Sequence, residues 1–177
     1  MGVLIDIADT IEQQVFSKLS MINELKRYQV QEYFKNNNIQ LSRLASERST
    51  HQAINELINN FSNKQQWQNL LDKYDGRYKS LLSAFGWYDF FIISAKGTIV
   101  YSVARESDLG QKIPTDLKSS SFFQAFNLAQ QSNSSEIQFG DFAPYSPSND
   151  DPAAFLAQPL LKSDGHQALF VALQLPL

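Results

Sequence analysis

The chain has 177 residues, of which 43% are hydrophobic and 19% charged, values typical of one folded domain or two small ones. Its net charge of −3 and isoelectric point near 5.3 argue against nucleic acid or an anionic lipid surface as a partner. The sequence contains no cysteine, which excludes disulfides, thiolate catalysis and cysteine-based metal sites.

The character of the sequence changes near residue 86. Residues 1–85 contain no proline, whereas all six prolines and five of the seven glycines lie in residues 86–177. The first part has ten basic and nine acidic residues, and the second has five and nine. We therefore predict a helical region over residues 1–85 and a strand-rich module over residues 86–177, packed together as one domain.

Apolar residues recur three and four positions apart from Leu4 to Phe34, which predicts one helix ending near Lys35. Three asparagines follow, and they favour a turn over a helix. Such a helix would be about 50 Å long. Its apolar stripe either packs on the core or pairs with another chain. Shorter helices are predicted at Leu41–Glu47, His51–Phe61 (with Thr50 as its N-cap) and Gln65–Phe85.

The second part predicts five strands and one helix. Ala95–Gly97 indicates a hairpin between the first two strands. Runs of consecutive apolar residues indicate that both sheet faces are covered, which leaves room for a pocket between the sheet and its connections. The fold class is thus α+β with an antiparallel sheet. The predicted strands are Tyr88–Ser94, Thr98–Ala104, Glu136–Phe142, Ala153–Leu161 and His166–Leu175, and the helix is Ser121–Gln131.

Several polar and aromatic residues in this part are candidates for a binding site. Tyr101 and Arg105 share one strand face, so Arg105 either lies at a solvated strand end or grips a carboxylate ligand in the pocket. Asp141 lies among aromatic residues such as Tyr145, and it is either a structural hydrogen-bonding group or a partner for a ligand amine. Tyr88 either caps the core or lines the rim of the pocket.

Catalytic motifs are absent from the sequence. It has no glycine-rich phosphate loop, no nucleophile elbow and no zinc-protease motif. The two histidines, His51 and His166, lie in different parts of the chain, and the carboxylates Asp89 and Glu106 have no candidate nucleophile beside them. We expect no enzymatic activity, no cofactor and no metal.

The sequence resembles extracellular Cache sensor domains, which are PAS-like. The run YDFFIISAKGTIVYSVARESDLGQKI resembles the first hairpin of that family. The runs FGDFAPYSPSNDDPAAFLAQPLL and ALFVALQLPL resemble its later strands. The preceding INELKRYQVQEYFKNNNIQLSRLAS is similar to the juxtamembrane helix of that family. The resemblance covers about residues 20–177.

The resemblance implies a periplasmic sensor domain of a bacterial transmembrane receptor, most often a methyl-accepting chemotaxis protein. A small molecule (an amino acid, amine or carboxylate) would bind as the roof segments Arg105–Lys118 and Gly140–Asp151 close, and a shift would pass to membrane helices that flank this chain. We also expect a homodimer through the N-terminal helix. The candidate ligand-binding residues are Tyr88, Tyr101, Arg105, Asp141, Tyr145 and Phe155.

Three other functions remain open at this point. The chain is alternatively the sensor region of a histidine kinase or cyclase, or a dimerising interaction module with no small ligand. A cytosolic PAS domain with a bound cofactor is disfavoured, because the sequence lacks cysteine and has only two histidines to anchor haem or flavin.

Overall fold

The computed structural model describes residues 2–161 and 167–176. Its contacts divide the chain into two compact units, Met1–Ile39 and Gln40–Leu177. The change in composition at residue 86 therefore falls inside the second unit. His166, at which the last strand was predicted to begin, lies outside the described residues.

Helix α1 (Gly2–Ser46) is continuous over 45 residues, so the end predicted near Lys35 is wrong. The asparagines at positions 36–38 lie inside the helix. Asn37 is accommodated there because its Nδ2 donates a 2.9 Å hydrogen bond to the carbonyl oxygen of Tyr33, four residues earlier. Residues 41–46, predicted as part of a separate helix, are the last turns of α1.

Two further helices follow close to their predicted bounds, α2 (Arg48–Asn60) and α3 (Lys64–Phe85). Thr50 is not the N-cap of α2: Glu47 occupies that position, and Thr50 is buried within the first turn. Helix α3 ends at Gly86, which adopts the left-handed conformation (φ 70°) that favours glycine after a helix.

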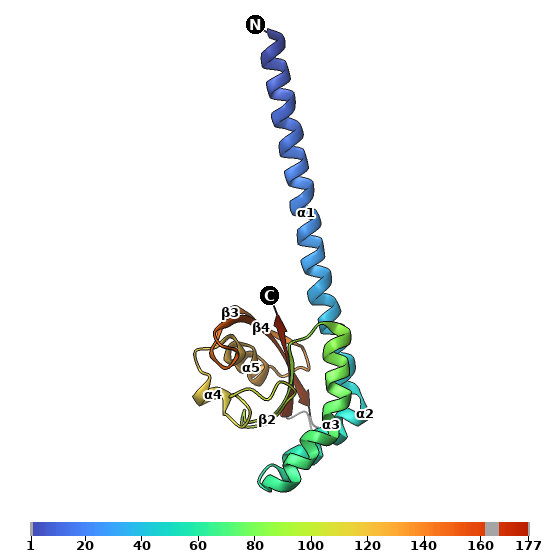
Figure 1. Ribbon diagram of the computed structural model, residues 1–177, viewed down its shortest axis with the longest axis vertical. Helices are drawn as coiled ribbons and strands as arrows, with labels where there is room; N and C mark the ends of the chain where they lie inside the picture. Colours follow the sequence, from blue (N-terminus) through green and yellow to red (C-terminus); the bar gives the residue numbers. More distant parts are fainter. Residues whose placement is uncertain (1, 162–166, 177) are drawn as a thin grey trace. The chain divides into compact units, whose positions relative to one another are not determined.

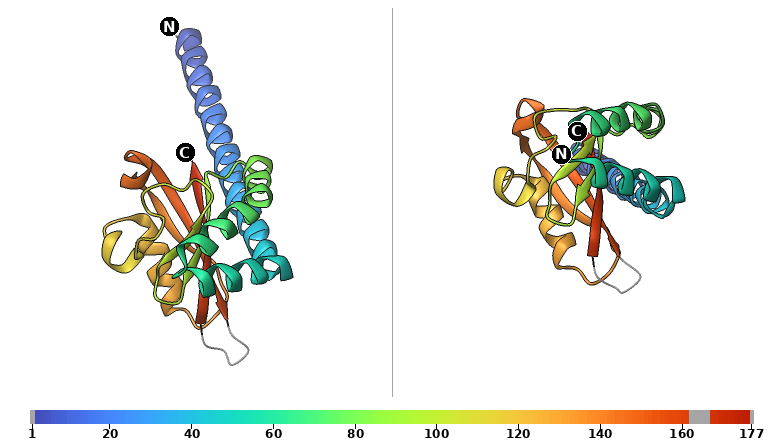
Figure 2. Two further views of the ribbon diagram at one scale, coloured as in Figure 1. Left: turned by 60° about the horizontal axis from the view of Figure 1, so that its bottom comes forward. Right: turned by 90° about the horizontal axis from the view of Figure 1, so that it is seen from below.

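The second unit contains a five-stranded antiparallel sheet in the order β2-β1-β5-β4-β3, which confirms the predicted α+β class. Helix α5 covers one face of the sheet, and α2 and α3 lie on the other (Figures 1 and 2). The elements are β1 (Asp89–Ser94), β2 (Ile99–Ser102), α4 (Ile113–Asp116), α5 (Ser121–Gln131), β3 (Gln138–Tyr145), the 3-10 turn Ser146–Ser148, β4 (Asp151–Leu161) and β5 (Gln167–Pro176).

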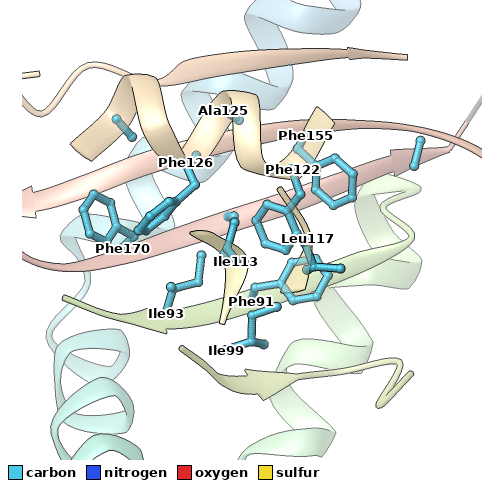
Figure 3. Close-up of a cluster of buried hydrophobic side chains, with 14 of the residues drawn as sticks. Phe91, Ile93, Ile99, Ile113, Leu117, Phe122, Ala125, Phe126, Phe155 and Phe170 are labelled. Carbon is cyan, nitrogen blue, oxygen red and sulfur yellow. The ribbon is translucent and has the colours of Figure 1, made fainter. Parts of the chain in front are cut away.

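Aromatic rings fill the space between α5 and the sheet (Figure 3). Phe122 of α5 stacks on Phe155 of β4, with ring centroids 4.4 Å apart and planes 6° apart. Strand β3 approaches α5 so closely that a Cβ atom at Gly140 would overlap the carbonyl oxygen of Ser121. Glycine at position 140 is therefore a steric requirement of this packing.

On the opposite face, α3 packs through Tyr78, whose ring stacks on Phe90 of β1 at 4.6 Å and contacts Tyr101 of β2 at 5.4 Å. In the described part of the chain, no helix combines the length and the hydropathy needed to span a bilayer.

Candidate functional site

A fully buried carboxylate organises the turn that follows β2. Asp89 Oδ1 accepts hydrogen bonds from the backbone amides of Phe90 (2.7 Å), Val103 (2.7 Å) and Ala104 (3.1 Å). Its Oδ2 accepts a 2.6 Å hydrogen bond from Ser102 Oγ. Burial nevertheless raises the pKa of Asp89 to about 7, because desolvation disfavours the ionised form more than these donors favour it.

Asp108, further along this turn, is also fully buried. The hydroxyl of Tyr145 donates a 2.6 Å hydrogen bond to Asp108 Oδ2, while no described residue donates a hydrogen bond of normal geometry to Oδ1. Desolvation raises the pKa of Asp108 to about 6, although the Tyr145 hydroxyl and nearby backbone amides act in the opposite direction. The same contact and its burial raise the pKa of Tyr145.

Between these two carboxyl groups, Glu106 links the turn to the rest of the site. Its Oε1 accepts from the hydroxyl of Tyr88 and its Oε2 from Ser148 Oγ, both at 2.6 Å. Gln174 Nε2 of β5 in turn donates to Ser148 Oγ at 3.0 Å. The amide oxygen of Gln174 is buried without a hydrogen-bond partner.

We call Asp89, Glu106 and Asp108 the acidic cluster. Their mutual repulsion is visible in the pKa values, since Asp108 raises the pKa of Asp89 and Glu106 raises that of Asp108. Within residues 2–161 and 167–176, no Lys, Arg or His forms an ion pair with any of the three. The described residues also contain no group of three or more acidic or histidine side chains placed to hold a metal ion.

Two turns surround the acidic cluster at the end of the sheet where β1 begins and β5 ends, and the first of them supplies Glu106 and Asp108. We call residues 103–110 the first roof turn and residues 146–150 the second roof turn. The second of the two predicted roof segments, 140–151, is only partly a loop, because its first half belongs to β3. Non-glycine residues with positive φ occur in both roof turns: Arg105 (54°), Asn149 (56°) and Asp150 (62°).

Arg105 bonds to α3 rather than to the acidic cluster. Its Nη2 lies 3.0 Å from Asp72 Oδ1 and 2.8 Å from Asp75 Oδ2. The hydroxyl of Tyr101 donates to Asp75 Oδ1 at 3.2 Å. Tyr101 and Arg105, which were predicted as a pair, therefore both bond Asp75 of α3, on the face of the sheet opposite α5.

The six predicted site residues occupy three separate places. Tyr145 and Phe155 contact each other with ring centroids 4.8 Å apart. Tyr88 bonds Glu106, which lies two residues before Asp108, the partner of Tyr145. Tyr101 and Arg105 lie against α3. Asp141 is exposed at an irregularity in β3, where its Oδ1 accepts a 2.8 Å hydrogen bond from its neighbour's amide. Their role as ligand contacts stays a prediction.

The sequence did contain a signal for the residues that were not predicted. Asp89 opens the buried run FFII and Gln174 interrupts the apolar strand LFVALQLPL, so both are polar residues at positions where a core residue is expected. The two residues are register partners in the sheet. Glu106 and Asp108 follow a strand in an irregular turn, and only the fold shows their contacts with Tyr88, Ser148 and Tyr145.

Comparison with known proteins identifies the fold. No family model and no curated protein matches the sequence. Among solved structures, the sensor domain of DcuS from E. coli matches with a TM-score of 0.50 and 12% identity, over 80% of this chain and 86% of that domain. The chain has the fold of a Cache-type sensor domain.

Two longer proteins match at least as well. The extracellular domain of a protein described as the histidine kinase vpHK1S-Z8 matches with a TM-score of 0.51 and 14% identity, over 84% of this chain. A domain of a protein assigned to the sensory box/GGDEF family, from Vibrio parahaemolyticus, gives the same three values. This chain spans 53% and 56% of those two structures.

Proposed function

We propose that the chain is the periplasmic ligand-sensing domain of a bacterial transmembrane receptor, and that a small molecule binds at the acidic cluster beneath the two roof turns. One observation carries this proposal: Asp89, Glu106 and Asp108 lie at one end of the sheet and form no ion pair within the described residues, in a fold shared with extracellular sensor domains. Asp108 is the costliest of the three, since it is fully buried and only one of its oxygens accepts a hydrogen bond of normal geometry, and sites that bind ligands are where such a cost is retained.

The first roof turn offers a route for the signal. Arg105 holds this turn to Asp75 of α3, while Glu106 and Asp108 hold it to the opposite side of the sheet. A ligand that rearranges Glu106 or Asp108 would therefore also move the contact with α3. The shift is relayed only if the ligand binds one arrangement better than the other. We propose that it passes on to membrane helices that flank this chain.

We further propose that the apolar stripe of α1 pairs with a second copy of the chain. Four residues of the stripe are each about half exposed: Ile11 (55%), Val15 (51%), Leu19 (54%) and Ile22 (48%). Their spacing of three and four residues fits a two-helix seam. The same stripe supports the second candidate function, a dimerising interaction module with no small ligand.

Our first candidate for the output is a chemoreceptor of the methyl-accepting type, and the alternative is a histidine kinase or cyclase. The flanking sequence of the gene tests this directly. Membrane helices on both sides followed by a long coiled-coil hairpin would support the chemoreceptor, whereas a kinase or cyclase domain would replace it.

A thermal-shift screen of amino acids, amines and small carboxylates tests the sensor function. At least one compound should raise the melting temperature of the purified domain. Glu106→Gln should reduce that shift, because it removes one charge of the acidic cluster. Asp151→Asn is the matched control, since it removes an exposed carboxylate of β4. A screen without a stabilising compound would leave the interaction module as the better function.

A further inference from the structure

We propose that the ligand of the acidic cluster is a small primary ammonium compound, held by the unpartnered oxygens of Asp108 and Gln174 and by Glu106. This inference rests on the proposed function and names the chemistry of its ligand. The first support is that Asp108 Oδ1 and Gln174 Oε1 are both buried, and neither accepts a hydrogen bond of normal geometry from a described residue; for Asp108, its own amide and that of Leu109 lie only close enough to lower its pKa. The two residues are 0% and 2% exposed, so both are shielded from bulk solvent.

The connections between these groups bring Gln174 and Asp108 to the same end of the sheet. Gln174 is joined through Ser148 to Glu106. Asp108 follows Glu106 by two residues, and its partner Tyr145 directly precedes the 3-10 turn that contains Ser148. A primary ammonium group carries three N–H donors and no acceptor, which suits a site that offers acceptor oxygens and lacks donors to meet them. An ammonium group also supplies the positive charge that no described side chain brings to the acidic cluster.

The position of Arg105 argues against a carboxylate ligand. This guanidinium is the positive group closest in sequence to Glu106 and Asp108, but it is bonded to two aspartates of α3. A carboxylate placed at the acidic cluster would meet three acidic residues and no cation. Like charges at such separations are repulsive in a low-dielectric interior.

Aromatic rings adjoin the acidic cluster. They are fully buried and packed on one another, so the carbon atoms of the ligand would meet them only once the roof turns open. The Tyr145 ring, whose hydroxyl bonds Asp108, contacts Phe155 at 4.8 Å and Phe122 at 6.3 Å. Aromatic faces attract ammonium groups as well as hydrocarbon. A short alkyl chain on the amine is therefore favoured over the bare ammonium ion.

Access requires the roof turns to open, which breaks contacts of the first roof turn and releases strain in its backbone. Arg105 adopts a φ of 54°, which costs a side-chain-bearing residue of its size on the order of 1 kcal/mol. Asn149 and Asp150 adopt the same region at less cost. The Arg105 conformation is held by its ion pairs and by the bond from its amide to Ser102 Oγ (2.9 Å), so rearranging the turn releases strain.

The test compares three probes of equal carbon number at constant ionic strength and pH 7.5: n-butylammonium chloride, sodium butyrate and n-butanol. Isothermal titration calorimetry on the whole chain should detect n-butylammonium alone. Asp108→Asn should weaken this binding about tenfold or more, the loss expected for one buried charged hydrogen bond. Asp151→Asn, which removes an exposed carboxylate, should leave it unchanged.

The pH dependence gives a second measurement that does not depend on the folding of a variant. The titratable groups that face Asp108 are Tyr145 from β3, Asp89 from β1 and Glu106 from its own turn. Because a cation favours ionised carboxylates, n-butylammonium should bind more tightly at pH 8 than at pH 5.5 and release protons.

Each other outcome overturns the inference. Binding of butyrate but not of n-butylammonium would show an anion site and leave the sensor function intact. Stronger stabilisation by calcium chloride than by n-butylammonium would show a metal site. Failure of all three probes, with an amino acid or carboxylate found in the broader screen, would refute the ammonium ligand but not the sensor.

Discussion

Arg105 Nη2 lies 2.8 Å from Asp75 Oδ2, across 30 positions of sequence, so the first roof turn is tied to the middle of α3. The side chain of Asp75 is only 13% exposed and also accepts a hydrogen bond from Tyr101. This contact holds the arginine that the sequence indicated as a candidate for binding an anionic ligand.

A double-mutant cycle of Arg105→Ala and Asp75→Asn should give a coupling energy of about 0.5–1.5 kcal/mol in denaturant unfolding. Because this ion pair is partly buried, its coupling energy should exceed that of a fully exposed pair. Lys79→Ala is the control, since Lys79 meets the same carboxylate at 3.0 Å from a side chain that is 60% exposed. A coupling near zero would show that the first roof turn is held by its other contacts.

The stability of the protein should fall as the pH rises from 5 to 8. Asp89 and Asp108 have folded-state pKa values of about 7 and about 6, above the 3.8 of the unconstrained side chain. The folded state therefore binds more protons than the unfolded state in this range. Each carboxyl group contributes stability that is complete below pH ~4 and is lost as the pH rises through its folded pKa.

Calorimetry at half-unit pH steps measures this effect, and the slope should approach about 1.4 kcal/mol per pH unit for each group while it titrates. Asp108→Asn should flatten the profile, because it removes one titrating group and its repulsion of Asp89. Asp151→Asn should leave the profile unchanged. A melting temperature that is constant or rises towards pH 8 would contradict the burial of ionisable carboxyl groups.

Gly140→Ala should destabilise the protein by about 1–3 kcal/mol, because the added methyl group meets the backbone of Ser121, which cannot rotate away. Gly76→Ala is the opposite case. Gly76 lies inside α3 with open space around it, so the substitution should add about 1 kcal/mol of stability through helix propensity. Urea denaturation of both variants measures the two changes in the free energy of unfolding. Equal changes in the two variants would rule out the close approach of β3 to α5.

Self-association through α1 should respond to charge on one face of the helix only. Leu19→Glu should shift the protein towards monomer in sedimentation velocity at increasing concentrations. Gln13→Glu introduces the same side chain about 120° around the helix from Leu19 and about 165° from the middle of the stripe, and it should leave association unchanged. A strictly monomeric parent protein would remove the support for pairing of the isolated chain.

The elements of the sheet were predictable from local sequence because strands and turns follow short patterns. The bounds of α5 agree with the prediction, and those of β4 agree to within two residues. Residues 36–38 misled the prediction, since the side chain of Asn37 satisfies a helix carbonyl instead of breaking the helix. The helix propensity of asparagine alone does not predict this hydrogen bond.

The candidate site was less predictable, because it depends on the direction in which neighbouring side chains leave a turn. Arg105 and Glu106 are adjacent in sequence, yet one bonds to α3 and the other to the second roof turn. A strand pattern with period two does not extend into an irregular turn. Only the fold shows that Asp89, Glu106 and Asp108 form one cluster.

The hydrogen bonds around Glu106 all have the same polarity. Tyr88 and Ser148 each donate a hydrogen bond to Glu106, and Gln174 donates one to Ser148. Every donor in this series of hydrogen bonds is therefore directed towards the carboxylate of Glu106. Turning the Gln174 amide over would place its oxygen against Ser148, which would then have to turn its proton away from Glu106. The orientation of the Gln174 amide is thus coupled to the hydrogen bonding of Glu106, which lies two hydrogen bonds away, and the side-chain ¹⁵N signal of Gln174 would report the state of the site.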